Sequence, residues 1–281
     1  MKKKPTTPFL FKILAFIMRL LEKISPKLSG RLALFLFLHP IRYKRPDREL
    51  KCYNAAKRSF INVEGIKVAS YEWGKGPAVW IMHGWSGRAT QLSSFIKMLV
   101  DSGYKVIGID APGLGDSGGN NSSVLLFEKA LEALYQKHGK ALAYIGHSLG
   151  GAVGFFAMKN SIPFDKYISI STPTIADLIL HEAFDKFGTN QNSIDAMRQL
   201  IFERVGAPFE NYTASYWAQF APAIPFLIIH DEDDIEAHIE HAYFLKDLLP
   251  KAQAHFTKGL GHVRILRDEK IIEKVLEFIK E

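Results

Sequence analysis

Cysteine pairs are what this sequence most clearly lacks. Its 281 residues contain a single cysteine, Cys52, so there is no disulfide framework. This fits a reducing compartment, and a cytoplasmic location is expected, although many exported proteins also lack cysteine pairs. With 47% apolar and 23% charged residues, a chain of this length can bury a core that needs no disulfide.

Excess positive charge is also missing from most of the chain, although the whole sequence carries +7. Residues 1–50 hold twelve Lys and Arg against three Asp and Glu, a net charge of +9, which leaves −2 for residues 51–281. A basic body would have favoured an anionic substrate or nucleic acid as partner. The basicity belongs instead to an N-terminal extension, so we expect no nucleic-acid binding.

No hydrophobic run is long enough to span a bilayer, which needs about 20 apolar residues. Residues 9–24 are predicted to form a helix that is apolar except for Lys12, Arg19 and Lys23, which fall on one narrow stripe. A secretory signal is disfavoured, because the apolar stretch Ile13–Met18 is short and no A-x-A-like cleavage site follows it.

Residues 1–58 are therefore predicted to be a basic, apolar helical extension followed by a linker. Pro26 ends the first helix, a short apolar run follows over Arg31–Leu38, and the polar segment Arg42–Lys51 is interpreted as the linker. Two interpretations of residues 1–40 stay open. They could bind peripherally to an anionic membrane surface, or they could pack as ordinary core on the enzyme body or on its lid.

Short apolar strands alternate with helices from Phe60 onwards. This alternation is typical of a doubly wound, mostly parallel sheet, so an α/β domain is predicted over residues 59–281. The alternation fails in a helix-like, aromatic stretch that is predicted to be a lid at about 174–221. The expected strands are Phe60–Val63, Lys67–Trp73, Ala78–Met82, Lys105–Asp110, Ala141–Ile145, Lys166–Ile170, Pro225–Ile229 and Ala252–Thr257, and the expected helices are Gln91–Val100, Val124–His138, Leu149–Lys159 and Glu269–Lys280.

A glycine-flanked serine directly follows one of these strands. The sequence GHSLG at 146–150 comes after Ala141–Ile145 and opens a helix, which is the setting of the G-x-S-x-G motif. Such a tight turn needs flanking residues with almost no side chain, and it holds the Ser148 hydroxyl at the carboxyl edge of the sheet. The alternative is a glycine-rich turn without chemistry, and the strand–turn–helix setting favours the nucleophile.

Several motifs follow one another in an order that resembles the α/β-hydrolase family over residues 60–280. His83-Gly84-Trp85 looks like the oxyanion segment of the family, and the stretch 110–118 is similar to its loop after the following strand. His230–Asp234 resembles the turn that bears the acid, and the glycine-containing stretch 259–262 resembles the histidine loop. The order Ser, Asp, His along the chain is also that of the family.

This resemblance implies a catalytic triad in which Ser148 is the nucleophile and His262 is its general base. A serine hydroxyl is a poor nucleophile until a base removes its proton. The resemblance also implies that the backbone amides of Trp85 and Leu149 bind the oxyanion of a tetrahedral intermediate.

The acid of the triad is assigned by register within a crowded turn. In the family pattern the acid falls four residues past the histidine, which selects Asp234 after His230, with Asp233 as the alternative. The position after that histidine is usually glycine in the family. Here it is Asp231, a departure that puts the geometry of the turn in question.

The remaining histidines are expected to be structural. His147 lies inside the serine turn, and His83 is expected to brace the oxyanion segment through hydrogen bonds. His238 and His241 have a helical spacing that could suggest metal ligands, but no third ligand is evident, so a solvated helix face is expected. No metal and no organic cofactor is needed for the predicted reaction.

Apolar and aromatic side chains gather in the expected lid. They could line a pocket for an acyl or aromatic group, but the packing of the lid onto the body would explain most of them. They are Ile175, Leu178, Ile179, Phe184, Phe187, Phe202, Phe209, Tyr212, Tyr216, Trp217 and Phe220.

The sequence therefore predicts a serine hydrolase that cleaves carboxylic ester or thioester bonds of a small, lipophilic substrate through an acyl-enzyme. An acyltransferase or lyase with the same triad is an alternative, because a fold does not fix a reaction. A second alternative is a catalytically inactive binding protein of this fold at a membrane. Relatives with an aspartate nucleophile are disfavoured, because Ser148 occupies that position.

Overall fold

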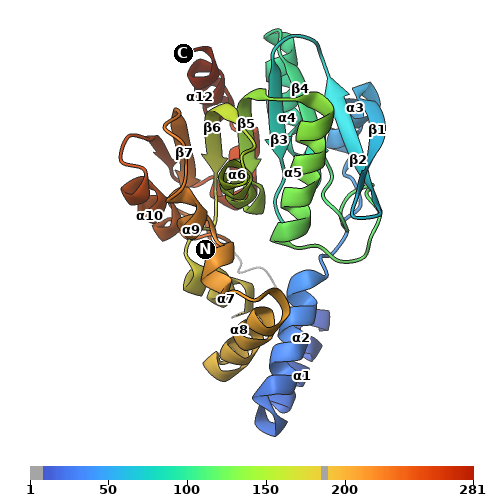
Figure 1. Ribbon diagram of the computed structural model, residues 1–281, viewed down its shortest axis with the longest axis vertical. Helices are drawn as coiled ribbons and strands as arrows, with labels where there is room; N and C mark the ends of the chain where they lie inside the picture. The colour runs from blue at the N-terminus through green and yellow to red at the C-terminus, as the bar shows by residue number, and fades with distance from the viewer. Residues whose placement is uncertain (1–8, 185–188) are drawn as a thin grey trace. The chain divides into compact units, whose positions relative to one another are not determined.

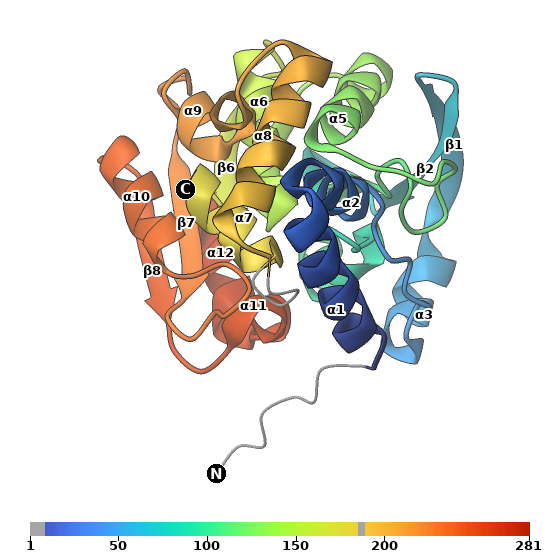
Figure 2. The same ribbon diagram turned by 90° about the horizontal axis from the view of Figure 1, so that it is seen from below.

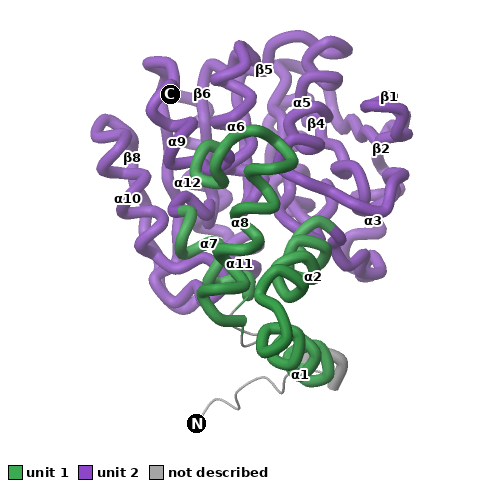
Figure 3. The backbone as a smooth tube through the Cα atoms, turned by 60° about the horizontal axis from the view of Figure 1, so that its bottom comes forward, with its two compact units in different colours: residues 1–38, 176–211 green, residues 39–175, 212–281 purple. Residues whose placement is uncertain are grey.

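The computed structural model describes residues 9–184 and 189–281, and from residue 12 onwards it also describes their side chains. Phe187, one of the expected lid residues, lies outside this part. The chain divides into two compact units (Figure 3). Unit 1 combines residues 1–38 with residues 176–211, and unit 2 combines residues 39–175 with residues 212–281.

Unit 2 is built on one eight-stranded sheet with the strand order β1-β2-β4-β3-β5-β6-β7-β8 (Figure 1). β1 and β2 form an antiparallel hairpin, β2 also pairs antiparallel with β4, and the other five pairings are parallel. The predicted doubly wound, mostly parallel sheet is confirmed. The strands are β1 Lys57–Val63, β2 Ile66–Trp73, β3 Ala78–Met82, β4 Lys105–Ile109, β5 Ala141–His147, β6 Phe164–Ile170, β7 Phe226–Asp231 and β8 Gln253–Thr257.

Successive residues of the central strands enter two different cores, one on each face of the sheet. In β3, Trp80 packs in one core while Val79 and Ile81 pack in the other, and all three are fully buried. Helices cover both faces, so these strands are apolar throughout. The helices of unit 2 are α3 Asp47–Ala55, α4 Ser93–Asp101, α5 Val124–His138, α6 Leu149–Lys159, α9 Ala214–Ala218, α10 Glu240–Leu248, α11 Gly261–Arg264 and α12 Glu269–Lys280, with short 3-10 turns η1 Ala89–Leu92 and η4 Ile265–Arg267.

The polar segment that was interpreted as a linker is partly helical, because α3 begins at Asp47. Its carboxylate Glu49 is buried and is held by Arg88, with Arg88 Nε 2.7 Å from Glu49 Oε2. The hydroxyl of Thr90 donates to the same oxygen at 2.8 Å. These partners lie far along the chain, so the local sequence pattern does not reveal them. Residues 39–58 belong to unit 2.

Unit 1 is a helical unit made of α1 Phe9–Ile24, α2 Pro26–Leu38, α7 Ala176–Phe184 and α8 Gln191–Val205. It also contains the turn η3 (Phe209–Tyr212) except for its last residue, which belongs to unit 2. Its core joins Met18 and Ala33 to Leu180, Ile194 and Met197. Figure 2 shows α2 beside α8. The N-terminal helices and the helices of the expected lid therefore share one core.

The contact between α2 and α8 depends on Gly30. A Cβ atom at Gly30 would lie 2.8 Å from the Cβ of Ala196 and 2.9 Å from the backbone nitrogen of Met197. Any side chain at this position would force the two helices apart. Close backbone packing of this kind shows that α2 is an integral part of unit 1.

Candidate active site

Ser148 lies in a sharp turn between β5 and α6, with φ 53° and ψ −126°. This left-handed region is costly for a residue with a side chain, so surrounding contacts must hold it. The amide of Ser148 donates to the carbonyl of Ile170 on the neighbouring strand β6 at 2.9 Å. Leu149 is the first residue of α6, so its own N–H has no acceptor within the helix. The positive end of the helix dipole therefore faces this turn.

The loop after β3 passes directly against Ser148. A Cβ atom at Gly84 would lie 2.6 Å from the Cβ and 3.1 Å from the Oγ of Ser148, so only glycine fits here. This close approach brings the next residue, Trp85, to the same edge of the sheet. The loop that carries Trp85 and the start of α6 at Leu149 thus both adjoin Ser148.

His83 braces this loop. Its Nδ1 donates to the carbonyl of Gly84 at 2.7 Å, and its Nε2 accepts from the amide of Ala111 at 3.0 Å. The ring is fully buried, and this burial holds the pKa of His83 below its usual value. A neutral ring with its proton on Nδ1 satisfies both hydrogen bonds, and it links the loop after β3 to the chain after β4.

The carboxylate of Asp234 is the one that contacts His262. Asp234 follows β7, and its Oδ2 lies 2.7 Å from His262 Nδ1. Its Oδ1 accepts from the amides of Glu236 at 2.9 Å and Ala237 at 3.0 Å. Burial opposes ionisation of this group, but the hydrogen bond and charge of His262 and the two amides outweigh it, so the pKa of Asp234 lies below its ordinary value.

The other two aspartates of this turn have different positions. Asp231 is buried at the end of β7, where its Oδ2 accepts from the hydroxyl of Thr257 at 2.7 Å and the amide of Leu260 at 2.9 Å. Its Oδ1 accepts from the amide of Asp233 at 3.0 Å, and Asp233 itself is exposed. Asp231 thus ties the acid turn to the histidine loop, which explains why a carboxylate can stand where the family usually has glycine.

His262 is held beside the serine turn from a second side. The Nε2 of His147 donates to the carbonyl oxygen of His262 at 2.9 Å, and the two rings lie 4.7 Å apart between centroids. Because His147 directly precedes Ser148, this contact fixes the histidine loop next to the serine. Burial, with the neighbouring His262, lowers the pKa of His147 to about 3, so its ring is neutral wherever the protein is folded near neutral pH.

Asp110 is buried and connects several loops near the site by hydrogen bonds. The sequence alone assigns no role to this carboxylate. Asp110 accepts from the amide of Ala89 at 2.7 Å, from the hydroxyl of Tyr71 at 2.7 Å and from the amide of Asp116 at 2.9 Å. Ser117 Oγ donates to the carbonyl of Asp110 at 2.5 Å. The stretch 110–118 therefore acts as a brace between β2, β4 and the loop after β3.

The solvated-face interpretation of the histidines on the α10 side is wrong for His241, which is fully buried. Its Nδ1 accepts from the amides of Thr174 at 3.0 Å and Ile175 at 3.1 Å. His241 therefore has a structural role at the end of the chain segment that follows β6. His238 is exposed.

Most aromatic residues of the stretch 174–221 are used in packing. Phe184 and Phe209 belong to the core of unit 1. In unit 2, Trp217 stacks on Phe156 with 4.4 Å between ring centroids. The exposed aromatic residues of this stretch include Phe202. Packing alone thus explains the burial of Phe184, Phe209 and Trp217, and no substrate pocket is needed to account for them.

The sequence matches the model of a family described as serine aminopeptidase, S33, over residues 76–178. This range contains the loop after β3, the brace at 110–118 and the turn with Ser148. No curated protein matches the sequence.

Solved structures with the same fold include two esterases and an epoxide hydrolase. An esterase from Pyrococcus furiosus is 18% identical, with a TM-score of 0.67 over 86% of this chain and 98% of its own. An esterase from Exiguobacterium antarcticum is 18% identical, with a TM-score of 0.61 over 79% and 99%. An epoxide hydrolase from Vigna radiata is 17% identical, with a TM-score of 0.59 over 81% and 98%. At these identities the likeness shows the fold alone.

Proposed function

We propose that this chain is an α/β-hydrolase that cleaves carboxylic ester or thioester bonds through an acyl-enzyme intermediate. The observation that carries the proposal is the Asp234–His262 pair, whose histidine is tied by its backbone to the turn that contains Ser148. A histidine that is oriented by a carboxylate and held next to the serine turn supports a serine nucleophile with a general base.

In the first half of the reaction, His262 removes the proton from Ser148 Oγ as that oxygen bonds to the substrate carbonyl carbon. The imidazolium that forms is stabilised by Asp234, whose carboxylate is ionised because its pKa is lowered. The tetrahedral intermediate then collapses, the bond to the alcohol or thiol breaks, and His262 gives its proton to that leaving group. An acyl ester on Ser148 remains.

In the second half, water takes the place of the alcohol. His262 removes a proton from the water as the water oxygen bonds to the acyl carbon. The tetrahedral intermediate then collapses, the bond from the acyl carbon to Ser148 Oγ breaks, and His262 gives its proton to that oxygen, which releases the carboxylic acid and regenerates Ser148. In both halves the amides of Trp85 and Leu149 would donate to the oxyanion. One such donor is typically worth about 2.7–4 kcal/mol of transition-state stabilisation.

Substitution of the serine tests this proposal. Ser148→Ala and His262→Ala should each abolish nearly all hydrolysis of p-nitrophenyl acetate by the folded protein, and the double variant should be little worse because the groups act as a unit. A fluorophosphonate probe should label the wild-type protein and leave Ser148→Ala unlabelled. Thermal melting monitors folding in each case.

Two outcomes would contradict the proposal. Substantial turnover by folded Ser148→Ala would exclude the serine as nucleophile. A wild-type protein that neither reacts with the probe nor hydrolyses any of a panel of esters and thioesters would favour the inactive binding protein. An acyltransferase would be recognised by faster release of p-nitrophenol when an alcohol is added, with the new ester as product.

A further inference from the structure

Helix α1 has two apolar faces, and only one of them is covered within unit 1. Met18 is fully buried and Leu14 is partly buried in the core shared with α7 and α8. The second face is apolar but lies outside that core. Its members Ile13, Phe16, Ile17, Leu20 and Ile24 are between 40% and 68% exposed.

These exposed residues form one continuous stripe. At about 100° per residue, Ile13, Ile17, Leu20 and Ile24 fall within an arc of about 60°, with Phe16 at its edge. Single exposed apolar residues need no explanation, but a contiguous stripe on one helix marks an interaction surface.

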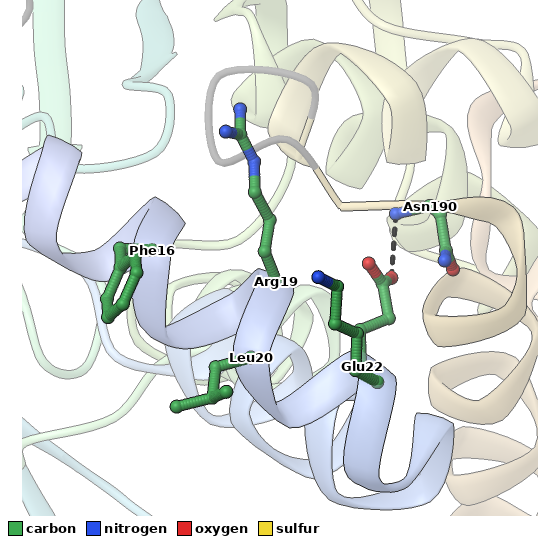
Figure 4. A pocket seen from close by; sticks show the side chains of 6 residues that line it. Phe16, Arg19, Leu20, Glu22 and Asn190 are labelled. Carbon is green, nitrogen blue, oxygen red and sulfur yellow. Dashed lines mark hydrogen bonds between the residues drawn. The ribbon is translucent and has the colours of Figure 1, made fainter.

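The cations of α1 flank this stripe on the side of Phe16. Lys12, Arg19 and Lys23 are all exposed and share an arc of about 40° at the same helical spacing. Figure 4 shows Arg19 leaving the helix on the side of Asn190, whereas Leu20 points away from it. A long basic side chain beside an apolar face can reach a phosphate while its alkyl stem covers apolar surface.

The exposed stripe of α1 and its flanking cations contain no acidic residue. Glu22 is the only acidic residue among the first 46 residues of the sequence. Its carboxylate turns into unit 1, where it accepts from the amide of Asn190 at 2.8 Å and from the hydroxyl of Ser193 at 2.5 Å. The exposed surface of α1 is thus apolar and cationic, and Lys2, Lys3 and Lys4 precede it in the sequence.

A surface hollow lies on the cationic flank. It has a volume of about 450 Å³, and its lining combines apolar side chains with a guanidinium group, an ammonium group and the partly buried carboxylate of Glu22 (Figure 4). Arginine and lysine offer N–H donors that suit phosphate oxygens. The lining residues are Phe16, Arg19, Leu20, Glu22, Lys23 and Asn190.

We propose that α1 docks unit 1 onto the surface of an anionic phospholipid bilayer, with its exposed stripe in the acyl boundary and its cations at the lipid phosphates. Within residues 9–184 and 189–281, no helix is long and apolar enough to cross a membrane. A helix with separate apolar and cationic stripes is the form that lies in the interface plane. Charge complementarity selects anionic lipid over a second copy of this surface, which would bring like charges together.

If α1 docks on the membrane, the helices of residues 176–211 are held at the membrane surface with it. α1 and α2 share one core with α7 and α8, so docking α1 holds the whole of unit 1 at the lipid surface. This proposal does not depend on the esterase chemistry, because binding to vesicles is measured without any substrate.

Vesicle sedimentation of the full-length protein tests the docking. The protein should sediment with phosphatidylcholine vesicles that contain phosphatidylglycerol and much less with phosphatidylcholine alone, and added salt should weaken the binding. The double substitution Phe16→Glu and Leu20→Glu should abolish sedimentation. Phe202→Glu, which places the same charge on an exposed phenylalanine of α8 in the same unit, should leave it intact.

A second variant measures how much the cations contribute to vesicle binding, apart from the insertion of apolar side chains. Arg19→Gln with Lys23→Gln should lower affinity for the anionic vesicles by about fivefold for each cation removed, and it should leave the melting temperature unchanged. The proposal is overturned if the wild-type protein ignores anionic vesicles at low salt, or if the Phe16/Leu20 double variant still binds. It is also overturned if the stripe mediates dimerisation, seen as a dimer in solution that the double variant converts to monomer.

Discussion

Of the three aspartates in the acid turn, only Asp234 places a carboxylate oxygen against the ring of His262. Asp234 Oδ2 lies 2.7 Å from His262 Nδ1, while Asp233 is exposed and Asp231 is engaged with Thr257 and Leu260. Register in the sequence selects Asp234, but the sequence does not say what Asp231 does. A hydrogen bond from a backbone amide leaves no pattern in side-chain types, so the role of Asp231 appears only in three dimensions.

Asp234→Asn is expected to lower kcat for ester hydrolysis by a factor on the order of 10³–10⁴, because an amide cannot hold the same tautomer of His262 or stabilise its charged form. Asp233→Asn removes an equivalent group from the exposed neighbouring position and serves as the control, with a change in kcat below about twofold. Steady-state assays with p-nitrophenyl acetate distinguish the two. A larger loss of kcat for Asp233→Asn than for Asp234→Asn would show that Asp233 is the acid of the triad.

At the scale of elements, strands and helices with strong periodicity are predictable, and α3 is not. The sequence pattern locates the strands of the sheet to within a few residues, and all of them except the edge strand β8 contain buried residues. The segment that contains α3 is polar and basic, so its local pattern indicates a linker. Its helix is held in place by Arg88, 39 residues away from Glu49, and periodicity carries no information about such a partner.

Glu49→Gln should lower the free energy of unfolding by about 3–5 kcal/mol, because it leaves the Arg88 guanidinium buried without its charge partner. Asp47→Asn, at an exposed position of the same helix, is the matched control and should change stability by less than about 0.5 kcal/mol. Urea unfolding followed by tryptophan fluorescence measures both. Equal effects of the two substitutions would mean that the buried pair contributes nothing specific.

Across the whole molecule, three buried histidines make the stability of the fold depend on pH. Burial lowers the pKa of His83, His147 and His230 below the usual value, in the case of His147 to about 3. Below about pH 6.5 the unfolded chain therefore binds protons that the folded chain does not. The free energy of unfolding must fall as the pH falls, by up to about 1.4 kcal/mol per pH unit for each such histidine.

His147→Gln should flatten this dependence, because glutamine does not titrate and still offers an N–H to the carbonyl of His262. Urea unfolding between about pH 7 and pH 5 measures the slope for the wild-type protein and the variant. The carboxylates Asp231 and Asp234, whose pKa values are lowered, lose their contribution only at more acidic pH, as the pH falls through those lowered values. Parallel slopes for the two proteins would show that His147 is already protonated in the fold.

Removing residues 1–38 should destabilise unit 1, because these residues contain helices that form part of its core. The deletion would uncover the core side chains Leu180, Ile194 and Met197, which pack against α1 and α2. We expect the truncated protein to aggregate or to become far more sensitive to limited proteolysis within residues 176–211, whereas the Phe16/Leu20 double substitution should not. A truncated protein with the protease resistance of the full chain would show that α1 and α2 are dispensable for that core.

The two-segment origin of unit 1 has a consequence for synthesis on the ribosome. α1 and α2 emerge first, but their packing partners α7 and α8 follow only after residues 39–175 have been translated. At about 5–20 residues per second, the wait lasts roughly 7–27 seconds. During this time Met18 and Ala33, which become core, are exposed together with the apolar stripe of α1. The nascent chain must therefore keep its first two helices from aggregating, and a chaperone or a lipid surface near the exit tunnel could provide that protection.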